Sequence, residues 1–178
     1  MSTLAVTVNG SAVSIRRNPA FIVHDVLAGT PNHATFAINS PSPAVNQDVQ
    51  ATLGGTLAFA GTTQQIVQTF EGQPGNLMFA ITAIDYTWKL NATRPFGEFP
   101  PDANGNPQTS LTTILQQLFA TYAVGFTTNN VQANLPAIAV VIDGSQDWST
   151  VLANLTGLVG AHWYVDYTKD LHVFTLSL

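Results

Sequence analysis

Apolar and polar side chains alternate through most of the first half of the chain, in short runs separated by turn residues. Residues 4–8 and 11–15 alternate in this way, and Asn9-Gly10 between them can supply the positive φ angles of a two-residue type I′ turn. A hairpin is therefore predicted near the N-terminus. Residues 21–27 form either a strand or a short irregular segment, and further strands are predicted over residues 34–39, 49–53, 56–60 and 64–70.

Short strands with a turn signal about every ten residues are typical of a small antiparallel barrel or sandwich. Gly61 interrupts the alternation between residues 56–60 and 64–70. A glycine inside a strand pattern indicates a bulge or a sharp bend, which lets one long strand turn a barrel corner. We therefore expect residues 1–91 to form a small antiparallel β-barrel.

Residues 76–91 join two different patterns. They begin with strand-type residues and end on Asp85, Tyr86 and Trp88, directly before a region rich in glycine and proline. Strands predominate before this segment and helical spacing appears after it, so we expect it to end one half of the chain and lead into the other. On this pattern alone, Asp85 is a turn-forming or capping residue.

The second half alternates helix and strand. Residues 92–109 are rich in Pro, Gly and Asn and predict a linker or long loop. Thr109 or Ser110 can cap a helix whose apolar residues recur at helical spacing as far as Tyr122. Residues 137–143 are almost continuously apolar, which is typical of a strand covered on both faces. Ser145 is predicted to cap a second helix that ends at Gly160.

Residues 161–178 predict a hairpin that turns at Thr168-Lys169. The expected fold class is therefore α+β. It consists of an antiparallel β-barrel (residues 1–91), a linker (residues 92–109) and a two-helix α/β domain with a C-terminal hairpin (residues 110–178).

Charged residues make up only 8% of the 178 residues, and the net charge is −5. An average soluble domain has roughly 25% charged residues. A sparsely charged surface is poorly protected against association, so we expect much of it to contact other subunits, with a neutral polar monomer as the alternative. The five Lys and Arg residues are scattered, which argues against a groove that follows nucleic-acid phosphates.

The chain contains no cysteine, which excludes disulfides and thiolate metal ligands. Its longest apolar run, residues 137–142, is far shorter than the roughly 20 residues of a membrane-spanning helix. The first residues lack the basic and apolar regions of a secretory signal. We expect a soluble protein without a membrane span.

The hairpin carries the densest group of potential metal ligands, which are His162, Asp166, Asp170 and His172. With a turn at Thr168-Lys169, residue 165 would face residue 172, and the two histidines would lie on opposite faces. This register argues against a metal site, although a register shifted by one residue would again allow a metal site here.

No pattern indicates an active site. Asp143 and Asp147 are either a pair of catalytic carboxylates or, as we expect, acids that complement the positive end of a helix. His24-Asp25 lacks a nucleophile motif, and no phosphate-binding glycine pattern is present. We predict no catalytic, cofactor-binding or metal-binding residues and no enzymatic activity.

The tryptophans offer an alternative chemistry, the stacking of sugars on aromatic rings. Trp148 and Trp163 lie on apolar faces of their predicted elements, which favours core packing. Trp88, with Phe96 and Phe99, is the candidate platform for a glycan.

Several motifs, taken in order, resemble phage tail hub and baseplate hub proteins. Phe59-Ala60-Gly61 is similar to the F-x-G that ends a strand in this family, and residues 83–90 are similar to its A-x-D-Y-T-x-x-L strand ending. Residues 160–166 resemble its G-x-x-W-Y-V-D hairpin. The resemblance covers most of the chain from residue 34 onward.

This resemblance implies a structural role in the virion tail tip, after assembly in the host cytoplasm. The chain would form a trimeric or hexameric ring that joins the tail tube to the tip or spike and encloses a channel for the tape measure protein and DNA. The resemblance also places Phe59 and Gly61 at a barrel bend, and Asp85, Tyr86 and Trp88 at the junction with the α/β domain.

Such hubs usually carry a second barrel. The resemblance therefore implies either a split hub protein or a piece truncated from a longer one. The alternative function is a glycan-binding module of a phage tail tip.

Overall fold

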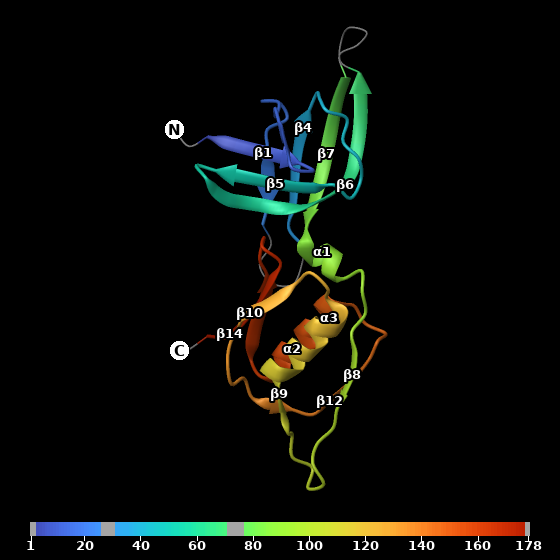
Figure 1. Ribbon diagram of the computed structural model, residues 1–178, viewed down its shortest axis with the longest axis vertical. Coiled ribbons are helices and arrows are strands. Elements are labelled where there is room, and N and C mark those ends of the chain that lie inside the picture. The colour runs from blue at the N-terminus through green and yellow to red at the C-terminus, as the bar shows by residue number, and fades with distance from the viewer. Residues whose placement is uncertain (1–2, 26–30, 71–76, 177–178) are drawn as a thin grey trace. The chain divides into compact units, whose positions relative to one another are not determined.

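The computed structural model describes residues 3–25, 31–70 and 77–176. These residues form two compact units, one from residues 3–25 and 31–86 and the other from residues 87–176 (Figure 1). Helices and strands are both present and strands predominate, which confirms the expected α+β mixture. Within the described ranges, no helix is long and apolar enough to cross a bilayer.

The first unit is a seven-stranded antiparallel sheet with the hydrogen-bonded order β2-β1-β5-β6-β7-β4-β3. Asn9 and Gly10 have φ angles of 50° and 76° and join β1 to β2, so the predicted N-terminal hairpin is confirmed. The strands are β1 (Leu4–Val8), β2 (Ser11–Val13), β3 (Ile22–His24), β4 (His33–Ile38), β5 (Asp48–Leu53), β6 (Thr56–Phe70) and β7 (Leu77–Asp85).

The predicted barrel is not closed. Among the described residues, the edge strands β2 and β3 do not pair with each other, and one isolated bridge from Ile15 to Ile38 of β4 is the nearest approach to closure. β2 and β3 are each only three residues long. The segment between them contains Pro19, which lacks the N–H that a ladder needs.

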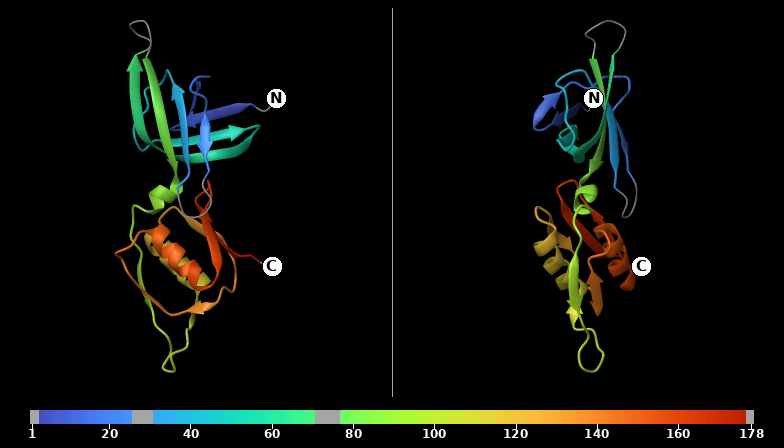
Figure 2. Two further views of the ribbon diagram at one scale, coloured as in Figure 1. Left: turned by 180° about the vertical axis from the view of Figure 1, so that it is seen from behind. Right: turned by 90° about the vertical axis from the view of Figure 1, so that its right-hand side faces the viewer.

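β6 is one continuous strand of 15 residues where the sequence predicts two. Its first part pairs with β5 and its last part with β7, so the strand turns from one direction to another along the sheet (Figure 2). The register shifts opposite β7 between Thr63 and Gln65, and opposite β5 beside Ala51. The bulges therefore lie on either side of Gly61.

The inner face of this sheet forms the core of the first unit. Side chains at alternating strand positions are buried there, as expected where one face of a sheet is covered. The larger buried residues include Val6, Val8, Phe36, Ile38, Val49, Phe59, Phe79 and Ile81.

The second unit contains a three-stranded sheet of order β10-β14-β13, in which β10 runs parallel to β14, and two short strand pairs, β11 with β9 and β12 with β8. The short helix α1 (Tyr86–Leu90) begins at the last residue of the first unit. The other elements are β8 (Phe96–Phe99), β9 (Thr109–Ser110), α2 (Leu111–Tyr122), β10 (Thr127–Val131), β11 (Ala137–Ile138), β12 (Val140–Asp143), α3 (Trp148–Leu158), β13 (Ala161–Val165) and β14 (Asp170–Thr175).

Two segments of the second unit differ from expectation. Part of the predicted linker, residues 96–99, is the strand β8, whose pattern is hidden among flanking prolines. Residues 137–143 are divided between β11 and β12 instead of forming one strand covered on both faces. Val141 of β12 is 66% exposed, so one face of this strand is not covered.

The helices bury the predicted faces. Leu111, Ile114, Leu115, Leu118 and Phe119 of α2 are buried, as are Trp148, Val151, Leu152 and Leu155 of α3. Ser110 is confirmed as the cap of α2 because its hydroxyl accepts a hydrogen bond from the Thr113 N–H. Gly160, with a φ angle of 67°, follows the end of α3 as predicted.

The predicted cap of α3 is wrong. Asp147 occupies the N-cap position, and its carboxylate accepts a hydrogen bond from the Thr150 N–H at 2.9 Å. Ser145 lies earlier in the loop and donates from its hydroxyl to Asp143.

The C-terminal hairpin is present, but its predicted register is wrong by one residue. Val165 pairs with Leu171, and Tyr164 pairs with His172. The turn spans residues 166–169, because the Asp166 N–H donates a hydrogen bond to the Asp170 carbonyl and closes the turn. His162 and His172 therefore share the more exposed face with Tyr164, rather than lying on opposite faces.

Candidate functional site

Gly61 lies where two neighbouring strands meet β6. It pairs with Val49 of β5 on one side and with Asp85 of β7 on the other. A β-carbon at this position would lie 2.1 Å from the carbonyl oxygen of Ile84. Only glycine allows this approach of two backbones. Phe59, two residues earlier, is fully buried in the core.

Asp85 and Tyr86 secure the end of β7 within the first unit. Asp85 is 3% exposed, and its carboxylate accepts from the Asn32 N–H at 2.8 Å while its own N–H donates to the Asn32 carbonyl. The Tyr86 hydroxyl donates to the Asp48 carboxylate at 2.5 Å. Burial raises the pKa of Tyr86, as do its hydrogen bond to Asp48 and the Asp48 charge.

The sequence did not predict the roles of Asn32 and Asp48. They lie 53 and 38 residues from their partners, and no local pattern links such distant positions. Trp88, the third predicted junction residue, follows in α1 and is 40% exposed.

The last part of β6 has an unpaired edge. Pairing with β5 ends at Thr62, and the Asn46 and Gln47 backbones continue the contact only as far as Thr63. From Gln64 to Phe70 the described structure places no strand on that edge, and the β6–β7 pair extends beyond its neighbours (Figure 1). Val67 and Phe70 are 48% and 69% exposed there.

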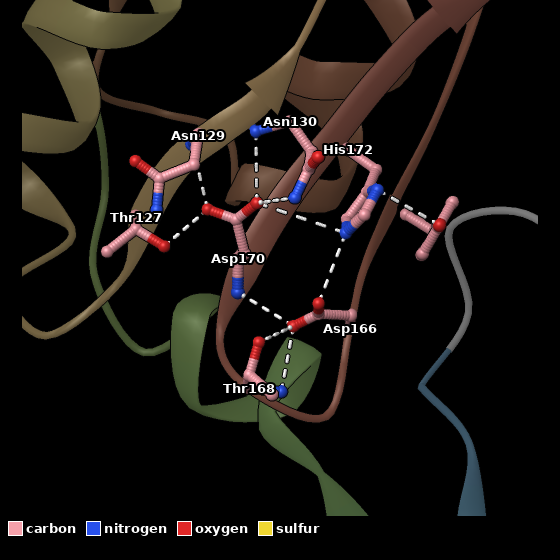
Figure 3. A network of polar contacts seen from close by, with 8 residues as sticks. Thr127, Asn129, Asn130, Asp166, Thr168, Asp170 and His172 are labelled. Carbon is pink, nitrogen blue, oxygen red and sulfur yellow. Dashed lines mark hydrogen bonds and ion pairs between the residues drawn. The ribbon is translucent and has the colours of Figure 1, made fainter.

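A buried carboxylate links β10 to β14 in the second unit (Figure 3). Asp170 is 4% exposed and accepts hydrogen bonds from the Thr127 hydroxyl, the Asn129 N–H, and the N–H and side-chain amide of Asn130. Burial raises the pKa of Asp170, but these hydrogen bonds outweigh it and hold the pKa below the ordinary value. With four donors around it, Asp170 fixes two strands.

Asp166 organises the adjoining turn. It accepts from the Thr168 N–H and hydroxyl and from the Asp170 N–H. Nε2 of His172 lies 3.1 Å from the Asp166 carboxylate and 3.9 Å from that of Asp170. Burial raises the pKa of Asp166, but hydrogen bonds from Asp170, Thr168 and His172 outweigh it and lower the pKa.

The corrected register brings His172 to both aspartates but does not create a metal centre. Among the described residues, no group of three or more His, Asp or Glu side chains is arranged to hold a metal ion. The carboxylates are instead occupied by donors from the chain itself.

Asp143 and Asp147, the candidate pair of carboxylates, both accept hydrogen bonds from nearby residues of the chain. Asp147 caps α3, and Asp143 accepts from Ser145 in the preceding loop. Hydrogen bonds from Ser145 lower the pKa of Asp143, and hydrogen bonds from Thr150 lower the pKa of Asp147. Asp147 thus agrees with the helix-terminus interpretation, whereas Asp143, at the end of β12, stabilises the loop before the helix instead.

The three aromatic residues of the expected glycan platform differ in exposure. Phe96 is 51% exposed and Trp88 is 40% exposed, whereas Phe99 packs against the hydrophobic core. Trp148 and Trp163 are core residues, as predicted, and the Trp148 indole N–H donates to the Thr93 hydroxyl at 2.9 Å.

Comparison with solved structures identifies the architecture. A 43 kDa tail protein of prophage MuSo2 from Shewanella oneidensis matches 99% of this chain with a TM-score of 0.73 and 12% sequence identity, over 55% of its own length. A tail protein from Neisseria meningitidis MC58 matches 97% of this chain with a TM-score of 0.72 and 13% identity, over 50% of its length. The chain has the fold of prophage tail proteins.

A third match widens this group. An E. coli type VI secretion component, described as structurally similar to the T4 bacteriophage tail proteins gp27 and gp5, matches 94% of this chain with a TM-score of 0.56 and 15% identity, over 47% of its length. The resemblance to phage tail and baseplate hub proteins is thus confirmed at the level of the fold. The chain spans about half the length of these structures. No protein-family profile and no curated protein matches the sequence.

Proposed function

We propose that this chain is a noncatalytic structural component of a phage tail tip or baseplate hub. In this role its first unit joins neighbouring subunits in a trimeric or hexameric ring that connects the tail tube to the tip or spike. The ring encloses the channel for the tape measure protein and DNA, and the chain works in the virion after assembly in the host cytoplasm. The shared fold with prophage tail proteins supports this assignment.

The unpaired edge of β6 carries the proposal. Soluble proteins protect exposed strand edges with charge, proline or short length. β6 lacks charge and proline, because its 15 residues contain no charged side chain and no proline, and its bulge between Thr63 and Gln65 lies at the start of the unpaired part. An unprotected edge of this kind favours pairing with a strand of another subunit.

The sparse charge of the chain supports the same role. A chain with only 8% charged residues suits extensive subunit contact, and only five basic residues limit attraction to DNA that passes through a channel.

The native mass of the purified protein, measured by light scattering and followed by negative-stain imaging, tests this proposal. We expect a trimer or hexamer with a central hole. A strictly monomeric protein across the accessible concentration range would contradict self-assembly through this edge.

A matched pair of variants locates the contact. Val67→Lys places a charge on the exposed edge of β6 and should convert the oligomer to monomer. Val141→Lys introduces the same change at an exposed position of the second unit and should leave the mass unchanged. An oligomer that tolerates Val67→Lys would show that assembly uses another surface.

A further inference from the structure

A groove of about 870 Å³ opens on the first unit, between the β1–β2 hairpin and residues 14–21. Its lining combines apolar side chains with the polar side chains of Ser14, Arg16 and Arg17. Val6 and Val13 are directly paired, so their side chains lie on the same face of the hairpin. Leu4, Ile15 and Phe21 continue this surface, and Leu4 is 40% exposed although it belongs to the inward-facing series of β1.

Positive charge lies beside these apolar side chains. Arg16 and Arg17 both line the groove, and they are two of the five basic residues in a chain of net charge −5. Arg17 is exposed, and within the described residues it forms no ion pair. Apolar side chains beside the exposed guanidinium of Arg17 suit a ligand that is both apolar and anionic.

The edge of β2 adds a backbone site. Val8 and Ser11 flank the two-residue turn and therefore exchange backbone hydrogen bonds. Ala12 occupies the next, non-hydrogen-bonded position, so its N–H and C=O point away from β1. β2 has no second neighbour in the described sheet. A strand paired at Ala12 would place alternate side chains on the face of Val13, over the groove.

We propose that this groove binds an extended segment of a partner protein that presents apolar side chains on one face and acidic side chains beside them. The apolar side chains cover Val13 and Phe21, the acids approach Arg17, and the segment backbone pairs with Ala12. This surface is separate from the unpaired end of β6, so the inference does not depend on the ring.

The probe is a fluorescein-labelled synthetic peptide of alternating valine and threonine with two glutamates at one end, so that acids can lie beside the valines; it is titrated with the full chain by fluorescence polarisation. The same peptide with lysine in place of glutamate is the charge control. We expect saturable binding of the acidic peptide, and about tenfold weaker binding of the lysine peptide.

Two substitutions separate the contributions. Arg17→Glu, at an exposed position, should weaken binding of the acidic peptide by about tenfold. Ala12→Pro removes the outward N–H and should weaken it by about tenfold, whereas Ala12→Thr retains that N–H and should bind as the parent does. Proline at an edge position whose N–H faces away from the ladder is compatible with a strand.

Three results would overturn the proposal: no saturable binding of the acidic peptide, equal binding of both peptides, or equal binding by the Pro and Thr variants. If decanoate displaces the acidic peptide and Ala12→Pro does not weaken binding of that peptide, the groove accepts an acyl anion instead of a strand. Circular dichroism checks the fold of each variant. If Ala12→Pro does not fold, Arg17→Glu and the lysine peptide decide the outcome.

Discussion

The carbonyl oxygen of Ile84 lies 2.1 Å from the position that a β-carbon on Gly61 would occupy. The carbonyl carbon of Ile84 and the α-carbon of Asp85 are within 2.8 Å of the same position. All three are backbone atoms of β7, so a rotamer change cannot relieve the overlap. The close approach of β6 and β7 therefore requires glycine at residue 61.

Gly61→Ala should destabilise the first unit by about 1–3 kcal/mol, because the added methyl group must displace a strand backbone. Urea unfolding monitored by far-UV circular dichroism measures this change. Gly157→Ala is the matched control, since it lies in α3 with no atom within 4 Å of the added carbon. That variant should gain about 0.5–1 kcal/mol. Equal effects of the two substitutions would refute the role of backbone contact.

Tyr86→Phe should cost about 1–3 kcal/mol, because it removes the donor to the partly buried Asp48 carboxylate. The measurement is the free energy of unfolding at neutral pH. Tyr122→Phe provides the comparison, since no hydrogen bond of the Tyr122 hydroxyl occurs within the described residues, and its effect should be small. If both variants lose the same stability, the Asp48 contact contributes little.

Asp147→Ala should destabilise α3 by about 1 kcal/mol, because the Thr150 N–H loses its acceptor. Ser145→Ala should cost less, since Ser145 does not cap the helix. Thermal unfolding of the two variants side by side distinguishes the caps. A larger loss for Ser145→Ala would favour the cap predicted from the sequence.

The Asp170 carboxylate should make stability depend on pH. Its pKa in the folded protein is lowered, so its contribution is complete above the ordinary pKa of about 3.9 and is lost as the pH falls from there through the folded value. Asp170→Asn should be less stable at pH 7 and should lose less stability on acidification. Urea unfolding at a series of pH values measures the difference between the two proteins, in which the other acids cancel. Parallel pH profiles would exclude Asp170 as a source of this dependence.

The helices were predictable because their signals are local. Spacing of apolar residues identified the buried faces of α2 and α3, and Asn9-Gly10 identified the first hairpin. Predictions failed where side-chain bonding within a loop decides between neighbours. Ser145 and Asp147 are both suitable caps, and the structure uses Ser145 as a donor to Asp143 instead.

The register of the last hairpin shows the same difficulty. Thr168-Lys169 suggests a two-residue turn, and Lys169 does have a positive φ angle of 67°. The Asp166 carboxylate, however, accepts hydrogen bonds from the N–H groups of Thr168 and Asp170. The turn is therefore longer than two residues. This bonding moves the pairing by one residue and brings the histidines to one face.

Pairing over long distances was beyond sequence patterns. The two partners of β6, the open order of the sheet, and the contacts of Asp85 with Asn32 and of Tyr86 with Asp48 all join residues that no periodicity connects. The motif resemblance indicated the fold family without these details, and the structural match at 12% identity agrees with it.

The three tryptophans, Trp88, Trp148 and Trp163, all lie in the second unit. Tryptophan fluorescence, excited selectively at the red edge of protein absorption, therefore comes from that unit alone. The first unit does not contribute to it. Far-UV circular dichroism records both. The protein thus carries its own optical label, and a mismatch between the two signals during unfolding would reveal directly whether one unit melts before the other.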